Sequence, residues 1–442
     1  MSLHPDRAPN RSAGLWQKLR AGVLVLAGLV AACASPSAAP QPGSGGSTAT
    51  PRPGQAQPDR SAEFRVQANA QVTPAHLNGR RVFRIAILAP FSSPNAGVRE
   101  AASTLQASAE LALFEHGDGS VILMPKDSGD TAEEAAAAAR LALQNGANVI
   151  LGPMFASGTL AVAPFARANN VPMFSFSADT TEAGRGVYVL TFLPEDEARR
   201  VISYAAGQGV RRLVIVVPQD RFGERYEAAA SEAAAAAGIQ VAGVARYDAQ
   251  RTAASLQAAA RQASTLASGG PRYATGIFMP DQGVTVRALA QTLSTTNASV
   301  TRVRYLGTGL WNDPATLQDS RLLGSWFPTP DLATRANFEA RFQQAFGRRP
   351  TRLAGMAYDA TALLVRIARN GDASGITPAA IGTPQGFFGV DGAFRFRNGV
   401  AERALAINEV GPRGLRVLEP APTSFGGPAA ALPRADQTAT AR

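Results

Sequence analysis

The sequence predicts an α/β protein of two lobes, each a mostly parallel sheet flanked by helices. From residue 82 onwards, apolar runs typical of buried strands alternate with helical segments. Strict alternation of this kind favours parallel sheets with right-handed crossovers. The alternation falls into two series that meet near residue 194. A length of 442 residues also exceeds one ordinary core, so two compact units with tails are expected.

The first series contains two helix starts that local signals define. Asp130 is expected to cap a helix, because Glu133 lies three residues further on, at the capping-box spacing. Gly152-Pro153 ends a short apolar run, and Ser157 or Thr159 is placed to cap the helix after it. The predicted strands are 82–89, 121–124, 148–151, 171–176 and 187–192, and the helices are 97–115, 130–145 and one that opens at 156–159.

The second series opens at Pro194, which three acidic residues follow, as is typical of a helix start. The end of the chain changes to an antiparallel pattern, because Asn398-Gly399 is a strong hairpin dipeptide between strands at 393–397 and 400–410. The other predicted strands are 212–217, 240–247, 274–279 and 303–307, and 415–418 could add a third strand to the hairpin. The predicted helices are 222–237, 252–267 and 283–294, and the run 322–327 leads into two more at 332–346 and 353–370.

Both ends of the chain differ from the middle. Residues 1–32 have the features of a targeting segment, with basic residues before an apolar stretch too short to span a bilayer. They end at Cys33, the only cysteine, in a Val-Ala-Ala-Cys sequence that resembles a bacterial lipobox. We therefore expect lipidation of Cys33, and Ala34 implies the outer membrane by the sorting rule for Gram-negative lipoproteins. Segments 33–80 and 420–442 are rich in small and polar residues, which predicts a tether and a disordered tail.

Composition excludes several classes of function. The formal net charge is +10, but the basic residues are scattered without interleaved aromatics, so no nucleic-acid partner is expected. After Cys33 only His76, His116 and Lys126 supply histidine or lysine, which leaves no histidine triad, zinc cluster or phosphate-binding loop. We expect no enzyme activity, no cofactor and no metal.

A candidate site follows from two neighbouring strands of the first series. The strand at 148–151 leads to Ser157, and the strand at 171–176 leads to a loop of hydroxyl and carboxyl groups at 177–180. Carboxyl ends of parallel strands share one edge of a sheet, where ligands of open α/β folds bind. The alternative interpretation is that these residues are ordinary caps and turns.

Several stretches together resemble type I periplasmic binding proteins of the leucine/isoleucine/valine receptor kind. They are VFRIAILAPFS, the run from DSGDTAEEA to FSFSADT, VIVVPQDRFGERY, GIFMPDQGVTVRALAQ, RYLGTGLWNDP and MAYDATALL. The resemblance implies the two-lobed fold of that family, joined by three crossings. Lobe one would be 81–194 plus 325–385, and lobe two would be 195–324 plus 386–419.

The ending FFGVDGAFRFRNGVAERALAINEV is similar to penicillin-binding-protein activators related to the C-terminal domain of LpoA. Those are outer-membrane lipoproteins that stimulate peptidoglycan synthases, which the expected lipid anchor and tether would suit. The resemblance thus implies a non-catalytic regulator on the periplasmic face of the outer membrane, with a penicillin-binding protein as partner. The alternative is a receptor that passes a branched-chain amino acid or similar small ligand to an ABC transporter.

By position, the resemblance implies a ligand cleft between the lobes. The lobe-two loop 308–312, which usually supplies an acid for a ligand ammonium group, contains none, so Asp179 or Asp281 could substitute. Packing between lobes is the alternative for Phe222 and Trp311, and helix capping is the alternative for Asp220 and Asp313. The candidate ligand-binding residues are Ser157, Ser177, Ala178, Asp179, Thr180, Phe222, Asp281 and Trp311.

Overall fold

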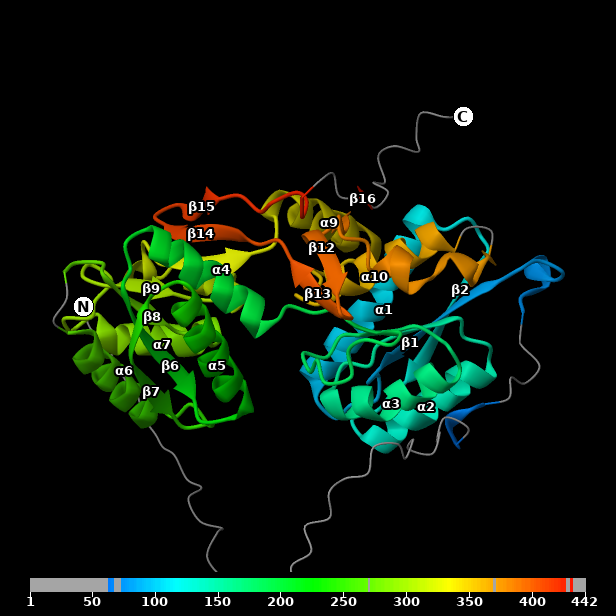
Figure 1. Cartoon of the computed structure of the whole chain (residues 1–442), viewed down its shortest axis with the longest axis horizontal. Helices are drawn as coiled ribbons and strands as arrows, with labels where there is room; N and C mark the ends of the chain where they lie inside the picture. The colour runs from blue at the N-terminus through cyan, green and yellow to red at the C-terminus, as the bar shows by residue number, and fades with distance from the viewer. Residues whose placement is uncertain (1–62, 67–72, 269–270, 369–370, 427–429, 432–442) are drawn as a thin grey trace, which may run out of the picture. The chain divides into compact units, whose positions relative to one another are not determined.

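The computed structural model describes residues 63–66, 73–268, 271–368, 371–426 and 430–431. Residues 1–32, Cys33 and most of segments 33–80 and 420–442 lie outside this part, so the statements about them stay predictions. The described residues form two sheets of mostly parallel strands flanked by helices, which confirms the predicted fold class (Figure 1). None of the described helices is long and apolar enough to cross a membrane.

The first lobe is built on a sheet whose order, in the described residues, is β16-β11-β12-β13-β5-β4-β3-β1-β2. Its strands are β1 (Phe83–Ala89), β2 (Val121–Asp127), β3 (Val149–Leu151), β4 (Met173–Ser175), β5 (Val187–Val189), β11 (Phe387–Gly389), β12 (Gly392–Arg397), β13 (Val400–Arg403) and β16 (Ala430–Ala431). Its helices are α1 (Ala96–His116), α2 (Ala132–Gln144), α3 (Ala156–Ala168), α9 (Leu332–Phe346), α10 (Ala354–Ile367) and α11 (Pro378–Ile381).

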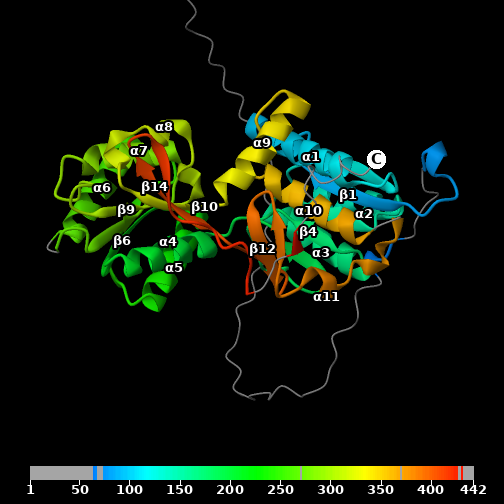
Figure 2. The ribbon, with the colours of Figure 1, turned by 90° about the horizontal axis from the view of Figure 1, so that it is seen from above.

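Helices cover both faces of this first sheet. Alternate side chains of β1 belong to different cores: Phe83, Ile85 and Ile87 pack with α1 and α10, whereas Ala86 and Leu88 pack with α2 and α3. Figure 1 shows α1 and α10 on one side of β1 and α2 and α3 on the other, and Figure 2 shows the same helices from above. A strand buried on both faces needs apolar residues at every position rather than at alternate ones. This need explains the continuous apolar run that predicted β1.

The second lobe is built on a sheet of order β15-β14-β10-β9-β8-β6-β7, again in the described residues. Its core is also two-sided, since one face packs on α4 and α5 and the other on α6 and α7. Its strands are β6 (Arg212–Pro218), β7 (Gln240–Tyr247), β8 (Thr275–Phe278), β9 (Arg304–Leu306), β10 (Trp326–Thr329), β14 (Ala406–Gly411) and β15 (Gly414–Glu419). Its helices are α4 (Pro194–Gly207), α5 (Arg221–Ala236), α6 (Ala253–Ala267), α7 (Gly283–Leu293) and α8 (Pro314–Leu317).

In chain order, the described strands change from one sheet to the other four times: after β5, after β10, after β13 and after β15. The third passage corrects the expected strand at 400–410. That run is divided into β13, which pairs with β5, and β14, which pairs with β10. The β12–β13 hairpin therefore belongs to the first sheet rather than to lobe two, and β10, expected in lobe one, belongs to the second sheet.

Two predicted helix caps were wrong. The capping box of α2 is formed by Thr131 and Glu134, one residue beyond the predicted pair Asp130 and Glu133. Helix α3 has Phe155 at its N-cap without a side-chain hydrogen bond, so neither Ser157 nor Thr159 caps it. The predicted helix at 353–370 ends at Ile367.

A short N-terminal segment is held against helix α3. The ring of Phe64 packs edge-on against Phe165, with 5.1 Å between ring centroids. The side chain of Asn169 also binds the backbone of this segment with two hydrogen bonds. It accepts from the Val66 N–H (3.1 Å) and donates to the Phe64 carbonyl (3.0 Å). This part of the expected tether is therefore a clasp on the first lobe.

Gly399 is expected to be essential where the hairpin joins the sheet. Its φ is +82°, and an added Cβ would lie 2.2 Å from the Gly184 nitrogen and 2.7 Å from the Val187 oxygen. Gly399→Ala should lower the free energy of unfolding by more than the roughly 1–2 kcal/mol that left-handed backbone costs a non-glycine residue. Urea denaturation measures this change. Gly414→Ala is the control, since Gly414 has φ +104° but no atom within 4 Å of an added Cβ. Equal losses in the two variants would contradict the steric argument.

Candidate functional site

The loop after β4 presents one side of a pocket between the lobes. Within this loop the Ser175 hydroxyl accepts from the Ser177 N–H (3.1 Å), and the Ser177 hydroxyl accepts from the Asp179 N–H (3.0 Å). The Asp179 carboxylate in turn accepts from the Thr181 N–H (2.9 Å). These successive side-chain-to-backbone bonds fix the loop in one conformation. Ala178 is consequently left exposed at its tip.

The start of α5 forms the opposite side of the same pocket. Asp220 caps this helix by accepting from the Gly223 N–H (2.8 Å), so its capping interpretation is confirmed. Phe222 is half-buried against Tyr226, with ring centroids 4.7 Å apart. Its aromatic edge and the exposed Arg221 therefore border the space opposite the loop.

Arg225 links the two sides. Its Nη1 donates to the Ala178 carbonyl of the first lobe. Its Nε and Nη2 donate to the two oxygens of Glu195 at 2.8 and 3.0 Å, a bidentate pair at the start of α4. Arg225 thus joins the loop after β4 to the first crossing.

These elements enclose what we call the cleft pocket, with a volume of about 680 Å³. Hydrogen bonds from Thr181 lower the pKa of Asp179, and the positive charges of Arg225 and Arg221 lower it further. The pocket therefore offers an ionised carboxylate beside a cationic side chain. Its lining residues are Ala156, Ser177, Ala178, Asp179, Thr180, Pro194, Glu195, Arg221, Phe222, Glu224 and Arg225.

Three predicted site residues lie elsewhere. Ser157 is exposed on the first turn of α3 and does not line the pocket, although its neighbour Ala156 does. Asp281 is buried and accepts from the Tyr247 hydroxyl (2.6 Å) and from Arg251 Nε (2.8 Å).

Trp311 is fully buried in the core of the second lobe, and its indole N–H donates to the Met279 carbonyl (3.0 Å). Its ring also contacts Phe327, at 6.1 Å between centroids, so it packs within the lobe instead of lining the cleft pocket. Asp313 caps α8, as its alternative interpretation held.

A buried carboxylate that the sequence analysis did not single out lies beside the first crossing. Glu197, on the first turn of α4, is 2% exposed. It accepts from the Tyr226 hydroxyl (2.8 Å), the Gly309 N–H (3.0 Å) and Arg352 Nη2 (2.5 Å). Burial and the nearby Glu197 charge raise the pKa of Tyr226, which keeps this hydroxyl protonated as a donor. In sequence, Glu197 is indistinguishable from its acidic neighbours at the helix start.

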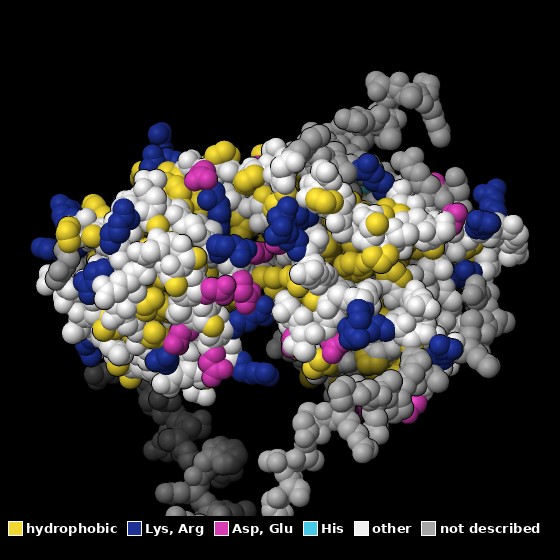
Figure 3. Space-filling model, in the orientation of Figure 1, with side chains coloured by type: hydrophobic (Ala, Val, Ile, Leu, Met, Phe, Trp, Pro, Cys, Tyr) yellow, Lys and Arg dark blue, Asp and Glu magenta, His cyan; other side chains and the backbone are white. Residues whose placement is uncertain are grey.

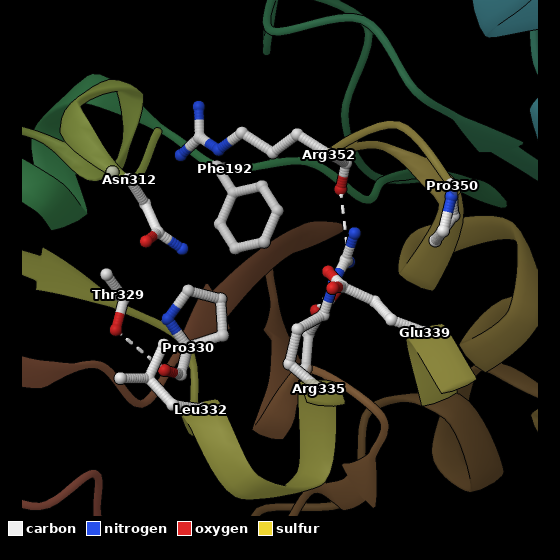
Figure 4. A pocket seen from close by; sticks show the side chains of 11 residues that line it. Phe192, Asn312, Thr329, Pro330, Leu332, Arg335, Glu339, Pro350 and Arg352 are labelled. Carbon is white, nitrogen blue, oxygen red and sulfur yellow. Dashed lines mark hydrogen bonds and ion pairs between the residues drawn. The ribbon is translucent and has the colours of Figure 1, made fainter. Parts of the chain in front are cut away.

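Arg352 and Gly309 also line a second, smaller space, which we call the junction pocket. Its volume is about 190 Å³, and residues from both lobes and from the crossings surround it (Figure 4). No residue lines both pockets. The residues around the junction pocket are Phe192, Gly309, Asn312, Thr329, Pro330, Leu332, Arg335, Glu339, Pro350, Arg352 and Asp391.

Buried charges lie behind the junction pocket. Asp391 accepts from Arg335 Nη1 (3.0 Å), and Asp359 accepts from the Val390 N–H (2.7 Å). Arg403 is 6% exposed, and none of its three guanidinium nitrogens has a hydrogen-bond partner among the described residues. Its guanidinium lies 4.7 Å from the centroid of the Phe192 ring. Burial, followed by the charge of Asp391, raises the pKa of Asp359, and Arg403 opposes this rise.

On the face seen in Figure 3, basic side chains are distributed over both lobes rather than gathered in one patch. No group of three or more histidine, cysteine, aspartate or glutamate side chains in the described residues could hold a metal ion. Unlike pockets confined to the second lobe, the cleft pocket and the junction pocket are each lined by residues of both lobes.

Residues 82–413 match the family model described as periplasmic binding protein. This match covers well over half of the chain, so the chain belongs to the periplasmic binding protein family. The family and its structural neighbours are solute-binding proteins rather than enzymes. No curated protein matches the chain in sequence.

Solved structures agree on the fold. A branched-chain amino acid ABC transporter periplasmic ligand-binding protein from Burkholderia xenovorans LB400 matches with a TM-score of 0.63 and 18% identity, over 78% of this chain and 97% of that one. A solute-binding protein of an ABC transporter from Rhodopseudomonas palustris BisB5, in complex with 3,4-dihydroxybenzoic acid, matches with a TM-score of 0.59 and 18% identity. The match covers 80% of this chain and 99% of that one. An ABC transporter substrate-binding protein from Desulfitobacterium hafniense, in complex with Leu, matches with a TM-score of 0.58 and 18% identity. The match covers 76% of this chain and 99% of that one. At these identities the likeness establishes the fold alone.

The raised pKa of Asp359 predicts how stability depends on pH. Because this pKa is higher in the folded than in the unfolded protein, the folded state binds the proton more tightly. The free energy of unfolding should therefore fall as pH rises from about 4 through the folded-state pKa. Burial also raises the pKa of Asp196, to about 6, which adds to the same slope.

Asp359→Asn should make the free energy of unfolding depend less on pH. The difference in this free energy, variant minus wild type, should be more favourable at pH 8 than at pH 5 by on the order of 1 kcal/mol or more. Urea denaturation across pH 4–8 measures the effect. Asp248→Asn is the control, because hydrogen bonds from Thr252 lower the pKa of Asp248. If the two variants had the same pH profile, Asp359 would not be the source of the slope.

Proposed function

We propose that the chain is a periplasmic solute-binding protein that holds a small zwitterionic ligand, such as a branched-chain amino acid, in the cleft pocket. The observation that carries the proposal is the pairing of opposite charges across that pocket. Asp179 supplies an ionised carboxylate from the first lobe, and Arg221 supplies a guanidinium from the second. A ligand ammonium group would bind the former and a ligand carboxylate the latter.

In this proposal Asp179 takes the role of the acidic residue that loop 308–312 lacks. Asp281, the other candidate, already accepts bonds from Tyr247 and Arg251 and is 1% exposed. Asp179 is partly exposed within the lining of the pocket, so it can reach a ligand. Phe222 offers an apolar edge for an aliphatic side chain. The partner in this proposal is an ABC permease that receives the ligand.

Ligand-dependent stabilisation tests this function. Leucine, isoleucine and valine at 100 times their Kd should each stabilise the mature protein by about 2.7 kcal/mol, read as a rise in Tm. Asp179→Asn should weaken binding at least tenfold, because it removes the charge that pairs with the ammonium group. Asp372→Asn, which changes an exposed carboxylate outside both pockets, is the matched control. A full rise in Tm for Asp179→Asn would remove this residue from the site, and no rise for any amino acid with the wild-type protein would overturn the function.

A second candidate function is activation of a penicillin-binding protein at the outer membrane. What favours it is the lipobox-like sequence at Cys33, followed by a segment rich in Pro, Gly and Ser. Lipidation there would anchor the protein to the periplasmic face of the outer membrane, away from an inner-membrane permease. In this proposal the lobes supply a contact surface for a peptidoglycan synthase.

This second function predicts that the purified mature protein increases glycan polymerisation by a class A penicillin-binding protein. The measurement is incorporation of labelled lipid II with and without an equimolar amount of the protein. Cys33→Ser should leave this stimulation in solution unchanged but move the protein from outer-membrane to soluble fractions of cells. An unrelated lipoprotein is the control, and equal synthesis with either protein would overturn the activator role.

A further inference from the structure

The junction pocket has an unused hydrogen-bonding edge on Arg352. One guanidinium nitrogen, Nη2, donates to Glu197. The guanidinium also lies 4.4 Å from the centroid of the Phe192 ring. Among the described residues, Nε and Nη1 of Arg352 form no hydrogen bond. A guanidinium has five N–H donors arranged in a planar fork, so one edge remains for a carboxylate.

Asn312 adds a second polar group to the same space. It follows the short helical turn Gly309–Trp311 of the second lobe and is exposed. Its side-chain amide forms no hydrogen bond within the described part of the chain. In Figure 4 this amide and the Arg352 guanidinium lie towards one end of the pocket, and Arg335 and Glu339 lie towards the other. Both free donors are therefore available to one ligand group.

Arg335, by contrast, already uses four of its five N–H donors within the protein. It donates to Asp391 (3.0 Å), Glu339 (2.7 Å) and the carbonyl oxygens of Thr351 (2.9 Å) and Arg352 (3.3 Å). Glu197 pairs with Arg352, and Glu339 and Asp391 pair with Arg335. Affinity for an anion must then come from the directed donors of Arg352 and Asn312, which favours one carboxylate over two.

The remaining wall is apolar and suits a flat ligand body. Phe192 presents an aromatic ring, and Pro330, Leu332 and Pro350 complete the surface (Figure 4). At about 30 Å³ for each water, 190 Å³ corresponds to roughly six water molecules. The pocket thus accommodates a ligand group of about benzoate size.

We propose that the junction pocket is a second binding site, for a small monocarboxylate with an aromatic or similarly flat apolar body. The carboxylate accepts from the free edge of Arg352 and from the Asn312 amide, and the body packs against Phe192. Arg352 belongs to the first lobe and Asn312 to the second, so the bound ligand bridges the lobes and favours the arrangement in which Arg352 reaches Glu197. This site is independent of the ligand proposed for the cleft pocket.

Isothermal titration of the mature protein with sodium benzoate tests the proposal. Benzoate should bind with 1:1 stoichiometry, and cyclohexylmethylamine, which matches its size but carries a positive charge, should not bind. Arg352→Gln should weaken benzoate binding at least tenfold. Arg348→Gln is the matched control, because Arg348 lies in the same region but bonds to Ser103 and Thr104 and lines neither pocket.

Asn312→Asp is the second variant, chosen because an exposed side chain tolerates the change even if Arg352→Gln disturbs the fold. Its carboxylate would repel the ligand, so binding should again fall at least tenfold. The absence of benzoate binding to the wild-type protein at 10 mM would overturn the proposal. Binding that survives both variants but is lost in Arg221→Gln would place benzoate in the cleft pocket, and would overturn this site while leaving the proposed function intact.

Discussion

The junction of the two lobes depends on the hydrogen bonds that the Glu197 carboxylate accepts. A buried ionised carboxylate costs several kcal/mol unless charged or polar partners replace its water. Here each partner comes from a different element: Tyr226 from α5, Gly309 from the turn after β9, and Arg352 from the loop before α10. Gly309 permits the approach, because a Cβ there would lie 2.9 Å from both Glu197 and Arg352. One side chain at the first crossing therefore fixes elements from both lobes, and with them one wall of the junction pocket.

The alternation of strands and helices could be predicted from the sequence because burial on both faces imposes continuous apolar runs on parallel strands. The same dependence on burial explains the main error in the predicted fold. Residues 400–410 satisfy strand patterning throughout, yet β13 and β14 belong to different sheets. Neither Ala404 nor Leu405, where the chain passes between the sheets, is a turn-forming residue, and both are buried. Hydrophobic patterning indicates that a residue is buried but does not indicate which sheet it joins.

Only part of the candidate site could be predicted from the sequence. Ser177–Thr180 and Phe222 meet in one pocket because strand ends and helix starts, which local sequence signals mark, face each other across the lobes. Asp281 and Trp311 follow strands in the same way, but tertiary partners inside the second lobe occupy them. Arg352 could not have been found from sequence, since its partner Glu197 is 155 residues away and no local pattern records such a pairing.

The clasp of Phe64 on helix α3 has a consequence for the length of chain between the expected lipid and the folded body. Without this contact, the chain would first be held at Thr73, whose hydroxyl accepts from Arg84 (2.9 Å), about 40 residues after Cys33, a length that a fully extended chain could stretch to roughly 130 Å. With the chain held at Phe64, only about 30 residues remain, and their extended limit is roughly 100 Å whatever conformation they adopt. The edge-on contact of two phenylalanine rings thus shortens by about a quarter the greatest distance at which the lobes could work from a membrane.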